Sequence, residues 1–166
     1  MAQNAGMIDI KNALLENSKV FQKAATECVD SYFQKKSVVR EAWNLCDRLE
    51  GNFDHIASIG CSNNAFQAIM TANINQDSLE AFLGQQQPSE EEIPDILGEF
   101  CNTFCGLVMD EEGIKGMFGV LLQALPLYSA HCSFFPKAAG IHGKVHIGDS
   151  WIYIGYAIRG NAGVLL

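Results

Sequence analysis

The segment PDILGEFCNTFCG, residues 94–106, carries an acid, Glu99, and an amide, Asn102, three positions apart. On an α-helix, residues i and i+3 are surface neighbours whose side chains project in the same direction. A carboxylate can pair with a cation, and a carboxamide can hold a water molecule by hydrogen bonds. This spacing predicts that the acid and the amide can enter one pocket together.

The helix that would carry this pair has two distinct faces. At 100° per residue, its apolar side chains gather on one face, which must belong to the core. Glycine inside a helix costs about 1 kcal/mol relative to alanine, so Gly98 and Gly106 need a reason, and Gly106 leaves the backbone open to another molecule. We expect partner contacts on the polar face from Asp95, Gly98, Thr103 and Gly106. The apolar face comprises Leu97, Phe100, Cys101, Phe104, Cys105 and Val108.

Two observations weaken the pair as a motif. An acid and an amide at this spacing also occur on ordinary solvated helix surfaces. A second pair, Glu41 and Asn44, shows that the spacing is not specific on its own. It lies in SVVREAWNLCDRLEG, residues 37–51, where an apolar stripe fits a helix while the valine pair and Trp43 favour a strand. Only the first pair, on a strongly two-faced helix, carries a functional hypothesis.

A zinc site is the main alternative chemistry. Cys101 and Cys105 are four residues apart on the same helix, and His142 and His146 are also four apart, so four ligands are conceivable. The spacing differs from that of zinc fingers, and both cysteines lie on the apolar face, where they are more simply core residues. The chain has no C-x-x-C motif, and no basic residue lies nearby to lower a thiol pKa. We predict no metal site and inert thiols.

The composition is that of one folded domain, residues 1–166, with 48% hydrophobic and 18% charged residues. A net charge of -8 with only 11 lysines and arginines argues against nucleic-acid binding, which needs clustered positive charge. The N-terminus lacks a leader pattern, and the longest apolar stretch is too short to cross a bilayer. We expect a soluble cytoplasmic protein with reduced cysteines, no membrane contact, and a protein or small molecule as its partner.

Helices are predicted in three places. Apolar spacing indicates a long helix from Asp9, as its N-cap, to about Phe33. DSLEAFLG predicts a short helix, with Asp77 near its start and Gly84 closing it. QQQPSEEE, residues 85–92, is a connector whose three glutamates suit the positive end of the helix that carries the acid and the amide.

Strands are predicted in two hairpins. HIASIGCSNNAFQAIMTANIN has apolar runs on either side of a turn at residues 62–64. GKVHIGDSWIYIGYAIRGNAGVLL has two β-rich runs separated by residues 148–150, and a last short run after Gly160 and Asn161. Helices interleaved unevenly with hairpins indicate an α+β fold, with helices packed on one face of a largely antiparallel sheet.

With these elements in place, GEFCNTFCG resembles the G-E-L-x-N-x-x-x-G signature of the CheX and CheC chemotaxis phosphatases, and is closest to CheX. The order of elements is also similar, including a short helix ending in LG, the motif helix, a strand near LLQALPLY and a C-terminal hairpin. The resemblance implies a CheC-like fold. Cys101 and Thr103 stand where the family usually has small or apolar residues, and DEEGIKGMFG predicts a shorter motif helix.

Members of this family remove the aspartyl phosphate of response-regulator receiver domains such as CheY by inserting the motif helix into the receiver's active site. Carried over by position, the resemblance implies that Glu99 pairs with the receiver's active-site lysine and that Asn102 orients the attacking water. The receiver would supply Mg²⁺, so no cofactor of the protein's own is expected. The resemblance also makes the Glu41 and Asn44 region a strand, which favours a single site, and it implies a homodimer that joins sheets.

The main alternative within the same fold is a non-enzymatic adaptor. Such a protein would bind a receiver or another signalling protein without hydrolysing phosphate. The two hypotheses differ at Asn102, whose amide matters for hydrolysis but not for association.

Overall fold

The computed structural model describes residues 2–84 and 88–161. Its helices are α1 (Ala2–Glu16), α2 (Ser18–Phe33), α3 (Gln76–Leu83), α4 (Glu92–Met109) and α5 (Glu112–Phe118). Its strands are β1 (Asn44–Cys46), β2 (His55–Ser62), β3 (Phe66–Ile74), β4 (Leu122–Gln123), β5 (Leu127–Ala130), β6 (Ala139–Ile147) and β7 (Ser150–Gly160).

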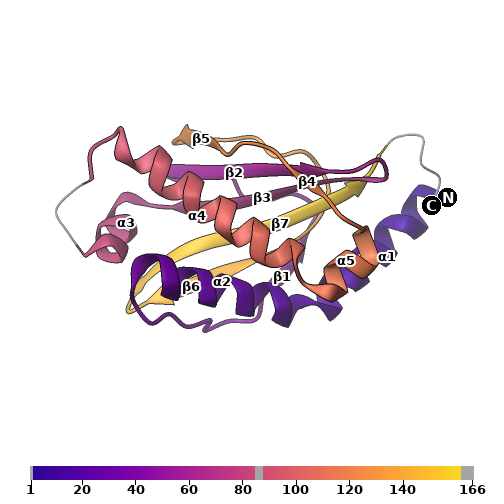
Figure 1. The fold of residues 1–166 in the computed structure, drawn as a ribbon, viewed down its shortest axis with the longest axis horizontal. Coiled ribbons are helices and arrows are strands. Elements are labelled where there is room, and N and C mark those ends of the chain that lie inside the picture. Colours follow the sequence, from indigo (N-terminus) through magenta and orange to yellow (C-terminus); the bar gives the residue numbers. More distant parts are fainter. Residues whose placement is uncertain (1, 85–87, 162–166) are drawn as a thin grey trace.

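One antiparallel sheet organises the described part of the chain. Its strands follow the order β1-β6-β7-β3-β2-β4, and β5 also pairs with β2. Helices α2 and α4 pack side by side across one face of this sheet, with α3 near one end and α5 near the other (Figure 1). The predicted α+β class is therefore confirmed.

Aromatic side chains fill the layer between the helices and the sheet. The ring of Phe21 on α2 lies 5.0 Å from that of Tyr156 on β7, measured between centroids. Phe33 on α2 and Phe100 on α4 are 5.6 Å apart. All four side chains are buried, so they tie α2 and α4 to each other and to the sheet.

The long N-terminal helix predicted from Asp9 to about Phe33 is wrong in its bounds, because it begins earlier and is broken at Asn17. The side-chain amide of Asn17 donates to the carbonyl of Ala13 at 2.9 Å, and its φ of -98° and ψ of 12° leave the helical region. A local side-chain bond of this kind competes with the regular helix ladder. The apolar stripe nevertheless continues through α1 and α2.

The ambiguous segment, residues 37–51, is not helical. Val38 forms an isolated antiparallel bridge with His146, and β1 pairs with β6. Trp43, just before β1, is buried against the sheet. The strand interpretation therefore holds over β1, and the remainder is irregular chain.

Both predicted hairpins are confirmed. Between β2 and β3, the Asn63 side-chain oxygen accepts hydrogen bonds from the backbone N–H groups of Ala65 and Phe66, each at 2.8 Å. Between β6 and β7, Gly148 has a φ of 58°, which suits glycine.

The expected strand near LLQALPLY is two short strands, β4 and β5. Between them lies Pro126, which has no N–H to donate to β2.

The helices α3 and α4 begin and end close to the positions predicted from the sequence. Helix α3 ends at Leu83 and is capped by Gly84, which has a φ of 63° and donates its N–H to the carbonyl of Glu80 at 3.0 Å. Helix α4 begins at the end of the glutamate run and ends at Met109, so DEEGIKGMFG lies beyond it and forms α5 instead of continuing the motif helix. Parts of two predictions, residues 85–87 of the connector and residues 162–166 of the last apolar run, lie outside the described residues.

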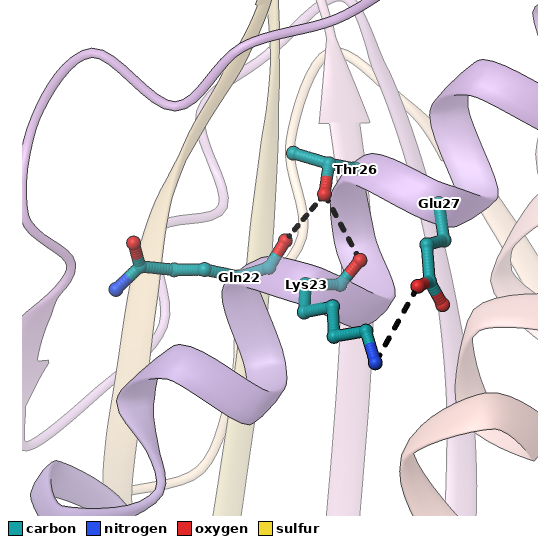
Figure 2. A network of polar contacts seen from close by, with 4 residues as sticks. All are labelled: Gln22, Lys23, Thr26 and Glu27. Carbon is teal, nitrogen blue, oxygen red and sulfur yellow. Dashed lines mark hydrogen bonds and ion pairs between the residues drawn. The ribbon is translucent and has the colours of Figure 1, made fainter.

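The outward side of α2 is polar and internally bonded (Figure 2). The hydroxyl of Thr26 donates to the carbonyls of Gln22 at 3.1 Å and Lys23 at 3.0 Å. Lys23 and Glu27 form an exposed i, i+4 ion pair at 3.7 Å. Such pairs contribute only a few tenths of a kcal/mol, so this surface adds little to the stability of the helix. None of the helices in residues 2–84 and 88–161 is both long and apolar enough to span a bilayer.

The contact between Trp43 and β6 gives a stability prediction. A Cβ atom added at Gly143 would lie 2.1 Å from Cδ1 of Trp43, whereas a Cβ added at Gly60 on β2 would meet nothing within 4 Å. We expect Gly143→Ala to lower the free energy of unfolding by about 1–3 kcal/mol through overpacking, and Gly60→Ala to leave it nearly unchanged. Urea unfolding of both variants measures this. Equal midpoints for Gly143→Ala and wild type would contradict the contact.

Candidate functional site

Helix α4 is fixed by its buried face. The predicted apolar face is confirmed, since all six of its residues are almost fully shielded from solvent: Leu97, Phe100, Cys101, Phe104, Cys105 and Val108. They pack onto β2 and β3 and against α2. Because a helix turns by 100° per residue, this burial directs the positions between them outward, on the side of α4 away from the sheet (Figure 1).

The first turn of α4 is acidic, and one of its carboxylates accepts a hydrogen bond from the chain just before the helix. The backbone N–H of Ser89 donates to the carboxylate of Glu92 at 2.9 Å. Pro94 lies in this turn, where its missing N–H costs nothing because no helical partner exists there. Glu92 and Asp95 place negative charge at the positive end of the helix dipole. The helix is therefore stabilised without using the residues further along its outer face.

Four of the six predicted site residues are exposed on that outer face. They are Asp95, Glu99, Asn102 and Thr103. Gly106 is half-buried, and a Cβ there would meet nothing within 4 Å, so the space above it is open. The hydroxyl of Thr103 donates to the carbonyl of Glu99 at 2.9 Å, so it is occupied within the helix.

Gly98 lies apart from this exposed group. It is buried, and a Cβ at this position would be 3.4 Å from the Cβ of Pro126, between β4 and β5. Pro126 therefore packs over this position. The burial of Gly98 contradicts the expectation that this residue contacts a partner.

The carboxylate of Glu99 is held by a neighbouring helix. The hydroxyl of Tyr32 on α2 donates to Oε2 of Glu99 at 3.2 Å. Burial, and then the nearby Glu99 charge, raise the pKa of Tyr32 to about 12, so this hydroxyl keeps its proton at neutral pH. The bond uses one carboxylate oxygen and leaves the other for a second partner.

The amide of Asn102 is held from the opposite side of α4. The side-chain nitrogen of Gln123, on β4, donates to the side-chain oxygen of Asn102. The same nitrogen lies 3.2 Å from the backbone carbonyl of Asn102. Sequence reasoning missed both Tyr32 and Gln123. Tyr32 follows the apolar spacing of the predicted N-terminal helix, and the only signal for Gln123 is that it is a polar residue within the apolar run LLQALPLY.

The outer face of α4 carries the acids Asp95 and Glu99, and neither forms an ion pair within the described part of the chain. The ion pairs among the described residues lie elsewhere, the nearest in sequence joining Lys115 to Asp110 at 3.7 Å, and none of them includes Glu99. A negative group next to a neutral amide favours a partner that brings its own positive charge.

The rival sites are not assembled. Cys101 and Cys105 are in the core between α4 and the sheet, where burial raises the pKa of Cys101 and the Sγ atoms of Cys105 and Cys61 are 3.0 Å apart. His142 instead packs on Tyr153, in the cluster on the other face of the sheet. Across the described residues, no group of three or more His, Cys, Asp or Glu side chains could hold a metal ion.

The second acid and amide pair is also not formed. Glu41 precedes β1, and Asn44 is its first residue, so the two do not share a helix face. In extended chain, residues three apart project to opposite sides. The single-site interpretation is the one that this geometry favours.

Comparison with known proteins gives a result only at the level of structure. No family model and no curated protein matches the sequence. Among solved structures, a CheC-like superfamily protein from Shewanella sp. PV-4 matches with a TM-score of 0.67 and 17% identity, over 88% of this chain and 97% of that one.

Two further structures share the arrangement. CheX from Borrelia burgdorferi, solved as a CheX-CheY-BeF3-Mg²⁺ complex, has a TM-score of 0.63 and 13% identity, over 85% of this chain and 96% of that one. The FliM middle domain from H. pylori has a TM-score of 0.61 and 8% identity, over 88% of this chain and 91% of that one. The protein therefore has the CheX/CheC-like fold.

Proposed function

We propose that the protein is a phosphatase that hydrolyses the aspartyl phosphate of a CheY-type receiver domain. The observation that carries the proposal is the pairing of Glu99 and Asn102 on the exposed face of α4, in a fold shared with a CheX that was solved bound to CheY. FliM shares the fold too, so the proposal rests on these side chains rather than on the fold. A receiver partner would place the protein in the cytoplasm.

In this proposal Glu99 is an anchor. A carboxylate that approaches a phosphorylated acidic site is repelled unless a lysine and a bound Mg²⁺ offset the charge. The second oxygen of Glu99 would accept a hydrogen bond from the receiver's lysine, while Tyr32 keeps the first oxygen in place. The Mg²⁺ ion belongs to the receiver, and no cofactor is assigned to this chain.

Asn102 has the chemical role. Its amide would hold a water molecule in line with the bond between phosphorus and the aspartyl oxygen. The water oxygen attacks phosphorus, the bond to the aspartate breaks, and both water protons leave with the inorganic phosphate. No protein base is needed overall, and phosphoryl transfer asks the catalyst mainly for positioning and charge stabilisation.

The first prediction concerns the amide. We expect Asn102→Ala to slow dephosphorylation about 100-fold, because the water is no longer oriented, while binding is retained. Decay of a receiver phosphorylated with acetyl phosphate, in the presence of Mg²⁺, measures the rate. Asn44→Ala, which removes the amide of the other E-x-x-N pair, is the matched control. If Asn102→Ala dephosphorylated the receiver as fast as wild type, Asn102 would have no part in the mechanism. If wild type did not change the decay rate of several receivers, the adaptor hypothesis would be favoured.

The second prediction concerns the anchor. We expect Glu99→Gln to weaken binding to a receiver activated with beryllofluoride by roughly 10- to 100-fold, and Glu99→Lys to weaken it more, because one charge-assisted bond is lost and then opposed. Calorimetric titration gives the affinities. Glu41→Lys, at an exposed position away from α4, controls for net charge. Unchanged affinity for Glu99→Lys would exclude Glu99 from the interface.

The third prediction concerns self-association, which we also propose. The segment of β4 and β5 forms a sheet edge with several exposed apolar side chains: Val120, Leu122, Leu125 and Leu127. Such an edge can pair with a second copy. We expect wild type to sediment as a dimer and Leu125→Glu, at a position 84% exposed, to shift it toward the monomer. A monomeric wild type at high micromolar concentration would overturn this proposal.

A further inference from the structure

Gln123 is held in a defined place beside the site. In the β2–β4 ladder, Gln123 pairs with Cys61, and paired residues of an antiparallel ladder share one face of the sheet. The thiol of Cys61 contacts Cys105, which is three residues after Asn102 on α4. The backbone of the next residue, Ala124, also donates to Gly60 at 2.8 Å. The ladder therefore points the half-buried side chain of Gln123 at the turn of α4 that carries Asn102.

The contacts of Gln123 determine which end of its own amide faces the helix. One neighbour is the backbone carbonyl of Asn102, at 3.2 Å, and a carbonyl can only accept a hydrogen bond. The atom of Gln123 that approaches it must be the nitrogen. The same nitrogen contacts the side chain of Asn102, which must therefore present its oxygen to β4.

We propose that Gln123 is a positioning residue that sets the orientation of the Asn102 amide for hydrolysis; this inference rests on the proposed phosphatase function. The oxygen and nitrogen ends of a carboxamide have nearly the same shape but opposite hydrogen-bonding roles. Without a fixed partner, the side-chain amide of an exposed asparagine can flip, so that its oxygen and its nitrogen exchange places. Gln123 removes this freedom by bonding the oxygen.

The bond leaves the amide able to act on water. A carbonyl oxygen has two lone pairs, and Gln123 uses one of them. The other can accept a hydrogen bond from the attacking water and so direct the water's own lone pair at phosphorus. Tyr32 and Gln123 thus act on α4 from opposite sides, the first on the anchor and the second on the water-orienting group.

The kinetic test uses two changes at this position. Gln123→Ala removes the donor, and we expect kcat for receiver dephosphorylation to fall roughly 2- to 10-fold, as for loss of one neutral hydrogen bond. Gln123→Glu replaces the donor with an acceptor, which would turn the Asn102 amide to present its nitrogen, so kcat should fall further than in Gln123→Ala. KM should stay within about twofold in Gln123→Ala, because the anchor is untouched.

Gln67→Glu is the matched control, since it makes the same chemical change at an exposed position on β3 that contacts Arg159. An equal fall in kcat for both Glu variants would overturn the inference, because it would assign the effect to the added charge. Wild-type kcat for Gln123→Glu would overturn the inference, and so would an effect confined to KM, which a repulsive charge alone would produce.

A structural readout separates this inference from the phosphatase proposal. In ¹⁵N spectra of the isolated protein, we expect the Asn102 side-chain NH₂ signals to shift in Gln123→Ala, and one proton to move downfield in Gln123→Glu as it donates to the new carboxylate. Unchanged Asn102 signals in both variants would overturn the positioning role whatever the activity. If the Asn102 signals shifted but the wild-type protein had no phosphatase activity, the contact between Gln123 and Asn102 would stand and the phosphatase proposal would be wrong.

Discussion

The packing of α4 on the sheet is the constraint on which the site depends. Its six predicted apolar residues are almost fully buried, and burial of a large apolar side chain contributes about 1.5–3 kcal/mol. A rotation of α4 that moved Glu99 or Asn102 inward would expose part of that surface and would bury the charge of Glu99 or the polar amide of Asn102. The orientation of the two polar groups is therefore set by the apolar ones. Gly98 belongs to the same packed region, since it is buried beside Pro126.

Periodicity explains why much of this was predictable from sequence. The two faces of α4 follow from 100° spacing, and the hairpins follow from alternating apolar residues around turns such as Asn63 and Gly148. Both are local signals, readable within one segment. The break at Asn17 was missed because a single polar side chain, bonded to Ala13, interrupts an apolar stripe that otherwise continues.

The supports of the site were not predictable in this way. Tyr32 and Gln123 reach α4 from segments about 67 and 21 residues away from their partners, and those contacts depend on how α2 and β4 are placed by the sheet. The burial of Gly98 also depends on a distant residue, Pro126. The acid and the amide could be identified from the sequence alone. The side chains that hydrogen-bond to them depend on how α2 and β4 pack around α4 in the folded protein.

We propose that Glu99 and Asn102 on α4 enable this protein to hydrolyse an aspartyl phosphate on another protein. The most direct measurement is the decay rate of a phosphorylated CheY-type receiver with Mg²⁺ as a function of added wild-type protein. We expect the decay to accelerate and to saturate with concentration, with stoichiometric release of inorganic phosphate. Decay at the spontaneous rate at every concentration, across a panel of receivers that bind the protein, would contradict it.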